Sequence, residues 1–247
     1  MSTVISREID ALMERYRPSS ALFFEHLQAA PTRVVRSPAV LGELYRRYQA
    51  GMHATRVMVY FLPHLDTPAL RARKLQIYID DDGLGDGDTH HAQLRRAFEA
   101  MGMSADAADD DRFGELDTLA AELDDKTAAF VRTVAELYAR SLGAWCVTEN
   151  FSDDWLHALA DGLAQHHPPI RDSQYFAECF DEGVEERHGE ESLRITEGLI
   201  ERRPELAAQI VADARIMAEA LCGLWSALDE VLTEAERGLP RSDSRRA

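Results

Sequence analysis

Apolar side chains recur at helical spacing along nearly the whole of this chain. Leu41, Leu44, Tyr48 and Met52, for example, follow one another at intervals of three or four residues. That spacing places them on one face of an α-helix. β-branched residues never alternate with polar ones over a stretch long enough for a convincing strand. The sequence therefore predicts an all-α protein with eight to ten helices.

Prolines, glycines and capping residues set the expected helix ends. Ser152, Asp153 and Asp154 are expected to cap a new helix, and three glycines within residues 83–87 prevent any helix from continuing there. We expect one domain over residues 1–237, and a disordered tail over residues 238–247 because that segment is short, polar and charged. The expected helices are 5–17, 20–30, 38–62, 68–80, 89–101, one or two within 114–150, 152–166, 172–202 and 204–237.

The composition excludes several classes of function. The net charge of −17 over 247 residues argues against binding to nucleic acid or to an anionic membrane surface. The N-terminal residues carry charges where a signal peptide is apolar, and no run approaches the ~20 apolar residues of a membrane span. A cytoplasmic protein is therefore expected. Cys146, Cys179 and Cys222 are odd in number and far apart, which indicates reduced thiols.

The stretch from Phe180 to His188 carries the first candidate metal ligands. On one continuous helix, Asp181, Glu185 and His188 would stand at i, i+4 and i+7 and share a face. That face becomes apolar further on, so the three groups would point toward a core. Buried carboxylates require a partner, and two carboxylates with an imidazole suit a divalent cation. The alternative is a solvated acidic helix face.

Glu149 is the second candidate. Trp145, Leu142 and Tyr138 precede it by four, seven and eleven residues, which places it on a buried helical stripe at the end of the predicted 125–150 helix. A lone glutamate in that position requires a partner. The alternative is a carboxylate at a helix end that reaches water.

Asp81 and His91 flank the glycine-rich turn and form the third candidate. His91 precedes Leu94 and Phe98 at helical spacing, so its ring is able to point into a bundle, while the glycines let the two helix ends converge. An acidic surface turn is the alternative. A calcium loop of the EF-hand type fits poorly, because the twelfth position counted from Asp80 or Asp82 is His91 or Gln93.

Carboxylates and imidazoles from several helices are what a dinuclear iron or manganese site requires. A ferritin-like arrangement is disfavoured, because it needs two Glu-x-x-His pairs and the candidate segments contain one, Glu185 to His188. In order and spacing the sequence resembles the haem-oxygenase-like di-iron oxidases and oxygenases, a superfamily that includes thiaminase II (TenA) and the PQQ-synthesis oxidase PqqC. The resemblance covers about residues 40–200 and rests on Asp81, the turn Gly83-Leu84-Gly85, His91, Glu149, Asp181, Glu185 and His188.

The chain departs from the family pattern at three of these positions. The family usually has Glu at the position of Asp81, His at that of Asp181 and Asp at that of Glu185. Four carboxylates would neutralise two Fe²⁺ ions, so the set is chemically reasonable. The assignment stays open to replacement by Asp80, Asp82, His90, Glu178 or Glu182.

The resemblance implies a haem-oxygenase-like helical bundle that binds two Fe²⁺ per chain and uses O2 as co-substrate. The implied reaction is oxidation of a small amine or amino-acid-derived substrate in natural-product biosynthesis, by N-oxygenation, C–C cleavage, desaturation or nitrile formation. Similar bundles commonly form homodimers. Tyr138, Trp145, Cys146 and Phe176 are candidates for the substrate pocket, with core packing as the alternative. Arg56, Arg95, Arg132 and Arg187 are candidates for binding a substrate carboxylate.

Other classes remain open at this point. A TenA-like hydrolase would use a cysteine nucleophile, for which Cys146 and Cys179 are available. A metal-free PqqC-like oxidase would need a basic pocket, which an acidic chain supplies poorly. A haem oxygenase would need an early proximal histidine, and His26 is the candidate. A non-enzymatic helical binding protein would leave every acidic cluster solvated.

Overall fold

The computed structural model describes residues 3–55, 65–82, 89–105, 123–180 and 183–238, with side chains at all of these except 52–55 and 80–82. Every regular element in these ranges is helical, which confirms the all-α prediction. The elements are α1 (Val4–Tyr16), η1 (Pro18–Ser20), α2 (Leu22–Ala29), α3 (Thr32–Val35), α4 (Pro38–Thr55), α5 (Pro68–Asp82), α6 (His90–Met101), α8 (Asp125–Arg140), α9 (Gly143–Ala164), η4 (Pro168–Asp172), α10 (Gln174–Phe180), α11 (Val184–Arg202), η6 (Pro204–Leu206) and α12 (Ala207–Gly238).

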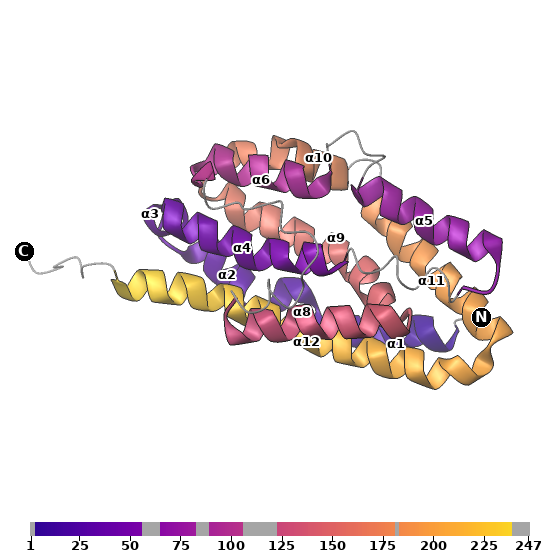
Figure 1. The fold of residues 1–247 in the computed structure, drawn as a ribbon. Helices are drawn as coiled ribbons and strands as arrows, with labels where there is room; N and C mark the ends of the chain where they lie inside the picture. Colours follow the sequence, from indigo (N-terminus) through magenta and orange to yellow (C-terminus); the bar gives the residue numbers. More distant parts are fainter. Residues whose placement is uncertain (1–2, 56–64, 83–88, 106–122, 181–182, 239–247) are drawn as a thin grey trace, which may run out of the picture.

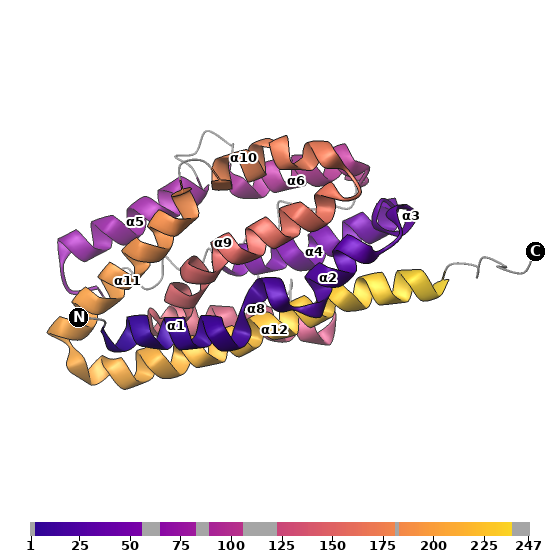
Figure 2. The same ribbon diagram turned by 180° about the vertical axis from the view of Figure 1, so that it is seen from behind.

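Helix α9 is the centre of the bundle. It contacts α11 on one side and α12 on another, and it also touches α2, α8 and α10. Figure 1 shows α6 and α10 side by side along one edge, α5 beside α11, and α12 along the opposite edge. In Figure 2, seen from behind, α1 lies along α12. The chain therefore surrounds α9 with helices on several sides.

The sequence of α9 explains its central place. Trp145, Phe151 and Leu159 lie on different faces of the helix, and all three are buried. From Gly143 to Ser152 every residue except the partly buried Asn150 is buried, and a segment enclosed on all sides is typical of a helix inside a core. Glu149 lies within this buried segment and shares its surroundings. None of the helices in the described ranges combines the length and apolar character that crossing a bilayer requires.

The boundary predicted at Ser152 is wrong. Helix α9 begins at Gly143, after a break at Ser141 and Leu142, and continues through Ser152 to Ala164. The Ser152 hydroxyl does not cap a helix, because it is buried and its single proton faces two acceptors, Glu185 Oε2 at 2.5 Å and the backbone carbonyl of Glu149 at 3.0 Å. Glu149 therefore lies inside a long helix and not at the end of one.

The single helix predicted over residues 172–202 is also wrong. The structure has α10 ending at Phe180 and α11 starting at Val184. Gly183, at the start of α11, has a φ of +68°, a left-handed conformation that suits glycine. Of the three residues predicted to share one helix face, Glu185 and His188 lie together on α11. Asp181 lies outside the described residues. The predicted tail over residues 238–247 lies outside them too, from residue 239 on.

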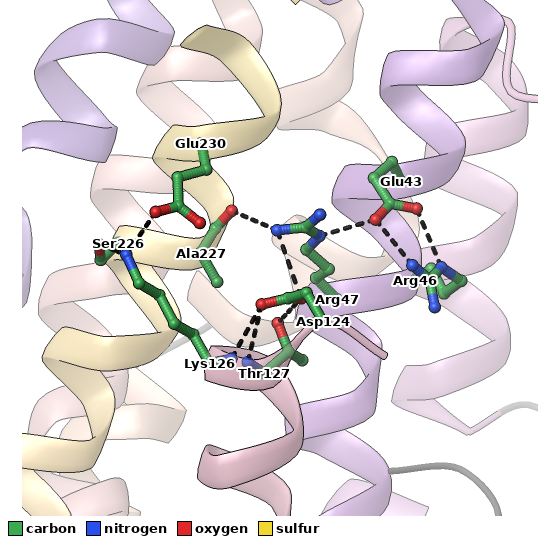
Figure 3. A network of polar contacts seen from close by, with 9 residues as sticks. All are labelled: Glu43, Arg46, Arg47, Asp124, Lys126, Thr127, Ser226, Ala227 and Glu230. Atoms are coloured by element: carbon green, nitrogen blue, oxygen red, sulfur yellow. Dashed lines mark hydrogen bonds and ion pairs between the residues drawn. The ribbon is translucent and has the colours of Figure 1, made fainter. Parts of the chain in front are cut away.

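A buried arginine joins the helices α4, α8 and α12 (Figure 3). Arg47 on α4 donates from Nε to Glu43 Oε1 and from Nη1 to the carbonyl of Ala227 on α12, both at 2.7 Å. Its Nη1 also lies 3.3 Å from Oδ2 of Asp124, the residue that caps the N-terminus of α8. Two residues after Asp124, Lys126 on α8 donates to Ser226 and Glu230 of α12. The network fixes α4, α8 and α12 relative to one another.

Replacing this arginine is expected to destabilise the fold. In Arg47→Met, two carboxylates each lose one of their donors and the carbonyl of Ala227 loses the guanidinium, while the site stays enclosed. The free energy of unfolding should therefore fall by about 2–4 kcal/mol. Urea denaturation measures the change. Arg46→Met is the matched control: that side chain is 33% exposed and pairs with the same Glu43. The control should lose no more than about 1 kcal/mol. Equal losses in the two variants would contradict the role of Arg47.

Candidate metal centre

Helices α9 and α11 approach each other closely where the candidate acids lie. A Cβ atom added to Gly189 of α11 would stand 3.3 Å from the carbonyl oxygen of Glu149 and 3.2 Å from Oδ1 of Asn150. The amide of Asn150 then holds the contact, since its Nδ2 donates to Ser192 Oγ at 3.0 Å and to the carbonyl of Gly189 at 3.3 Å. A glycine at position 189 is what allows this approach.

The structure brings Glu149, Glu185 and His188 into this contact. All three are buried, with 7%, 6% and 5% of their surface exposed. His188 Nδ1 lies 3.9 Å from Glu149 Oε2. The carboxylate of Glu185 accepts a hydrogen bond of 2.5 Å from Ser152 on α9. Two acids and an imidazole from two helices therefore share one enclosed space.

The electrostatics of this space favour the loss of negative charge. Burial raises the pKa of Glu149 well above its usual range, and repulsion by Glu185 raises it further. Burial likewise raises the pKa of Glu185, although its hydrogen bond from Ser152 works in the opposite direction. Enclosed carboxylates become neutral by taking up protons unless a cation compensates them. A divalent cation would supply that compensation.

Lys74 on α5 is a member of the site that the sequence reasoning missed. Its side chain is 2% exposed, and Nζ lies 5.1 Å from the centre of the Trp145 ring. Burial lowers the pKa of Lys74 to about 7, while the nearby charge of Glu149 acts to raise it. Two features of the sequence could have drawn attention to Lys74. Leu70, Lys74 and Ile77 follow one another at helical spacing, and Lys74 is one of two lysines among 27 Lys and Arg residues.

The other predicted ligands are placed only in part. His91 is buried on α6, with its ring 6.2 Å from that of Tyr45 on α4. The side chains of Asp81 and Asp181 lie outside those that the structure describes. Within the described part of the chain, no three His, Cys, Asp or Glu side chains are arranged to hold a metal ion. The six-ligand set thus stays a prediction, of which Glu149, Glu185 and His188 lie in one space.

The residues that the sequence left open as alternative metal ligands lie in different surroundings. Glu178 is exposed and accepts hydrogen bonds from Gln93 and Gln174, so it is engaged away from Glu149. His90 lies edge-on to Tyr175, with ring centres 5.9 Å apart. The side chains of Asp80, Asp82 and Glu182 are not among those described.

All four predicted pocket residues are buried. The hydroxyl of Tyr138 donates to Thr148 at 2.6 Å, and Phe176 packs against the rings of Tyr175 and Phe180. Trp145 lies beside Lys74. Burial raises the pKa of the Cys146 thiol to about 12. A role for these side chains in binding a substrate stays a prediction.

The fold and the site together define an all-α protein in which two carboxylates and an imidazole are enclosed between two helices. Residues 44–221 match the family described as iron-containing redox enzyme, and the chain belongs to that family. This assignment confirms the resemblance to the haem-oxygenase-like superfamily. Of the four arginines predicted to bind a substrate carboxylate, Arg132 and Arg187 are exposed and Arg95 pairs with Glu99, while Arg56 lies outside the described residues.

The fold also matches a solved structure. A CADD-like protein of unknown function from Nostoc punctiforme PCC 73102 aligns with a TM-score of 0.66 over 94% of this chain and 96% of the other. The identity is 17%, so the likeness shows the fold alone. No curated protein sequence gives a significant match.

The raised pKa values predict how stability depends on pH. The folded metal-free protein keeps protons on Glu149 and Glu185 at pH values where the unfolded chain has lost them, because carboxyl groups in the unfolded chain have pKa values near 4.3. The free energy of unfolding should therefore fall as pH rises from about 5 to 7. Glu149→Gln should reduce this slope and be more stable than wild type at pH 7 by about 1–3 kcal/mol.

Urea denaturation of EDTA-treated protein at several pH values measures this effect. Glu190→Gln is the control, since Glu190 is an exposed residue on α11 that pairs with Arg194 at the surface. The control should keep the wild-type slope. A Glu149→Gln variant with an unchanged slope would show that Glu149 is ionised in the folded metal-free protein.

Proposed function

We propose that this protein is an O2-dependent non-haem di-iron oxygenase or oxidase. Its substrate would be a small amine or amino-acid derivative in natural-product biosynthesis. The reaction would be N-oxygenation, C–C cleavage, desaturation or nitrile formation. Membership of the iron-containing redox family supports iron as the metal. The number of ions and the substrate are parts of the proposal.

The observation that carries the proposal is the pair Glu149 and Glu185 enclosed with His188 between α9 and α11. An enclosed pair of acids is costly in a protein that never binds a cation. Carboxylates are also the groups that bridge two iron ions, and imidazoles complete their coordination. The residues present therefore fit an iron centre.

In the proposed mechanism the chain supplies ligands, orientation and a dry space. Glu149 and Glu185 would hold the ions from α9 and α11, with His188, His91, Asp81 and Asp181 as further ligands. Bound ferrous iron would supply the electrons that activate O2 for attack on a substrate N–H or C–H bond. Ser152 fixes one oxygen of Glu185, which sets the direction of that carboxylate before any ion binds.

Lys74 and Trp145 would orient the substrate. An ammonium group beside Glu149 is the buried cation that a substrate carboxylate would approach, and the adjacent indole offers a flat apolar wall. The same cation lies near enough to Glu149 to influence its charge. An amino acid held by Lys74 would therefore present its amine or side chain toward the metal ligands.

A thiol-based hydrolase receives less support from the structure. Cys146 lies near the hydroxyl of Ser192, and burial raises the pKa of its thiol to about 12. A nucleophilic cysteine functions as a thiolate, which needs a lowered pKa. Cys146 has the properties of a buried core residue.

Iron uptake tests the proposal directly. Metal-free protein titrated anaerobically with Fe²⁺, with and without a panel of amino acids and amines, should bind two ions per chain. His188→Ala should lose at least one of these ions while its circular dichroism spectrum is unchanged, because the imidazole is a ligand and its removal does not break the helix. His157→Ala on the exposed side of α9 is the control. Absence of iron binding by wild type under all conditions would refute the proposed function.

The role of Lys74 leads to a second test. Wild type should bind amino acids at least about tenfold more tightly than the amines left after their decarboxylation, since the lost ion pair is worth about 1.5–3 kcal/mol. In Lys74→Met this preference should disappear, with amine affinity little changed. Isothermal titration calorimetry of each pair measures it, and Lys126→Met, an exposed site on α8, is the control. A preference that survives in Lys74→Met would assign carboxylate binding to another residue.

A further inference from the structure

Four oxidisable aromatic side chains from four helices lie in contact in a line. The hydroxyls of Tyr175 on α10 and Tyr48 on α4 are 3.5 Å apart. The indole Nε1 of Trp155 on α9 donates to the Tyr48 hydroxyl at 3.2 Å. The ring centre of Trp155 lies 5.8 Å from that of Trp225 on α12. We call these four residues the aromatic line.

The inner end of the aromatic line is next to the candidate metal centre. Tyr175 stands four residues before Cys179 on α10, and Cys179 hydrogen-bonds to the carboxylate of Glu185. The charge of Glu185 also acts on both Tyr175 and Tyr48, and it contributes to the raised pKa of each hydroxyl. The thiol of Cys179 therefore lies between Tyr175, the first residue of the line, and the predicted ligand Glu185.

The outer end reaches the surface. Trp225 lines a cleft of about 360 Å³ between the end of α1, the start of α2 and α12. Tyr16, Arg15 and the exposed Cys222 line the same cleft. A small soluble molecule in the cleft would therefore lie against the last ring of the line.

The polar atoms of three of the four side chains also meet. The oxygen of Tyr48 accepts from the indole of Trp155 and lies 3.5 Å from the hydroxyl oxygen of Tyr175, and either hydroxyl is able to donate in that contact. The three polar groups therefore follow one another from Trp155 through Tyr48 to Tyr175. Aromatic packing by itself buries rings and does not require their polar atoms to meet in this way.

We propose that the aromatic line carries oxidising equivalents from the iron centre to the cleft, where a thiol or ascorbate reduces them. This inference rests on the proposed function. Such a route would let an oxygen-activating protein transfer oxidising equivalents away from the iron centre when no substrate is bound. The residues of the line would then protect the ligands and the core from damage.

Atoms and electrons balance along the line. Tyr175 loses one electron and its phenolic proton to the oxidised centre, and Tyr48 restores both across the contact between the two hydroxyls. Trp155 restores Tyr48 in the same way by giving up one electron and the indole proton. Trp155 then takes an electron from Trp225 and a proton from water, since its side chain is partly exposed. A thiol at the cleft gives Trp225 one electron and releases one proton, and two such thiyl radicals form a disulfide.

Photo-oxidation of the metal-free protein tests the line without the iron centre. Cys222 is exposed, whereas Cys146 and Cys179 are buried, so a ruthenium polypyridyl photo-oxidant can be attached at Cys222 alone. Tyr16 lines the same cleft, so every protein carries Tyr16→Phe to prevent its direct oxidation. Illumination with an electron acceptor, followed by freezing, traps the radicals. Electron paramagnetic resonance with ring-deuterated tyrosine then distinguishes tyrosyl from tryptophanyl radicals.

The expected result is a tyrosyl radical in the Tyr16→Phe protein. Adding Trp155→Phe should abolish the tyrosyl signal and leave a tryptophanyl signal from Trp225. The double change Tyr48→Phe and Tyr175→Phe should also abolish it, and it removes two hydroxyls while keeping the rings that pack the core. Trp145→Phe and Tyr138→Phe are the matched controls, because neither residue belongs to the line, and both should keep the signal.

Two outcomes would overturn the inference. One is the absence of a tyrosyl radical in the Tyr16→Phe protein, and the other is a tyrosyl signal that survives the double change at positions 48 and 175. Neither outcome bears on iron binding, which the anaerobic titration measures separately. A failed line and a failed oxygenase assignment are therefore distinguishable.

Discussion

The burial of Glu149 and Glu185 in one contact between two helices is the constraint on which the centre of this structure depends. Each acid leaves water for a space lined by the core, where its ionised form is disfavoured. The chain surrounds them with groups that reduce the cost: the hydroxyl of Ser152, the imidazole of His188 and the amine of Lys74. In the metal-free protein the two acids reduce their charge further by holding protons, since burial raises the pKa of both. A divalent cation at this place, as proposed above, would take over that compensation.

The sequence predicted the fold class because helical periodicity is a local property that survives without tertiary information. It failed at two helix boundaries, where a local signal has more than one meaning. Ser152 has the residue type of a helix cap, but its hydroxyl donates to the carboxylate of Glu185 on α11, whose proximity the sequence alone does not reveal. Gly183 falls within an otherwise helical pattern, and only its left-handed conformation shows that α10 and α11 are separate.

The candidate site was predictable where it followed the apolar stripe. Glu149, Glu185 and His188 each stand at helical spacing from buried residues, and the structure places them together. Lys74 was missed because a lysine on an apolar face usually extends its amine to water, and only the packing of α5 shows that this one does not. His91 is buried as its spacing indicated. No spacing rule reveals whether ligands on different helices converge, since that depends on how the helices cross.

Among the described residues two cationic side chains are buried, Arg47 and Lys74, and they differ in how far fixed partners match their charge. Arg47 is bound by Glu43, Asp124 and a backbone carbonyl, so its charge is matched by fixed partners (Figure 3). Lys74 faces an aromatic ring and shares Glu149 with His188, and its amine holds its proton weakly. The first arrangement therefore joins α4, α8 and α12 through matched charges, whose loss costs stability. The second places a weakly protonated amine near the buried acids between α9 and α11, where a change in one charge alters the pKa of the others.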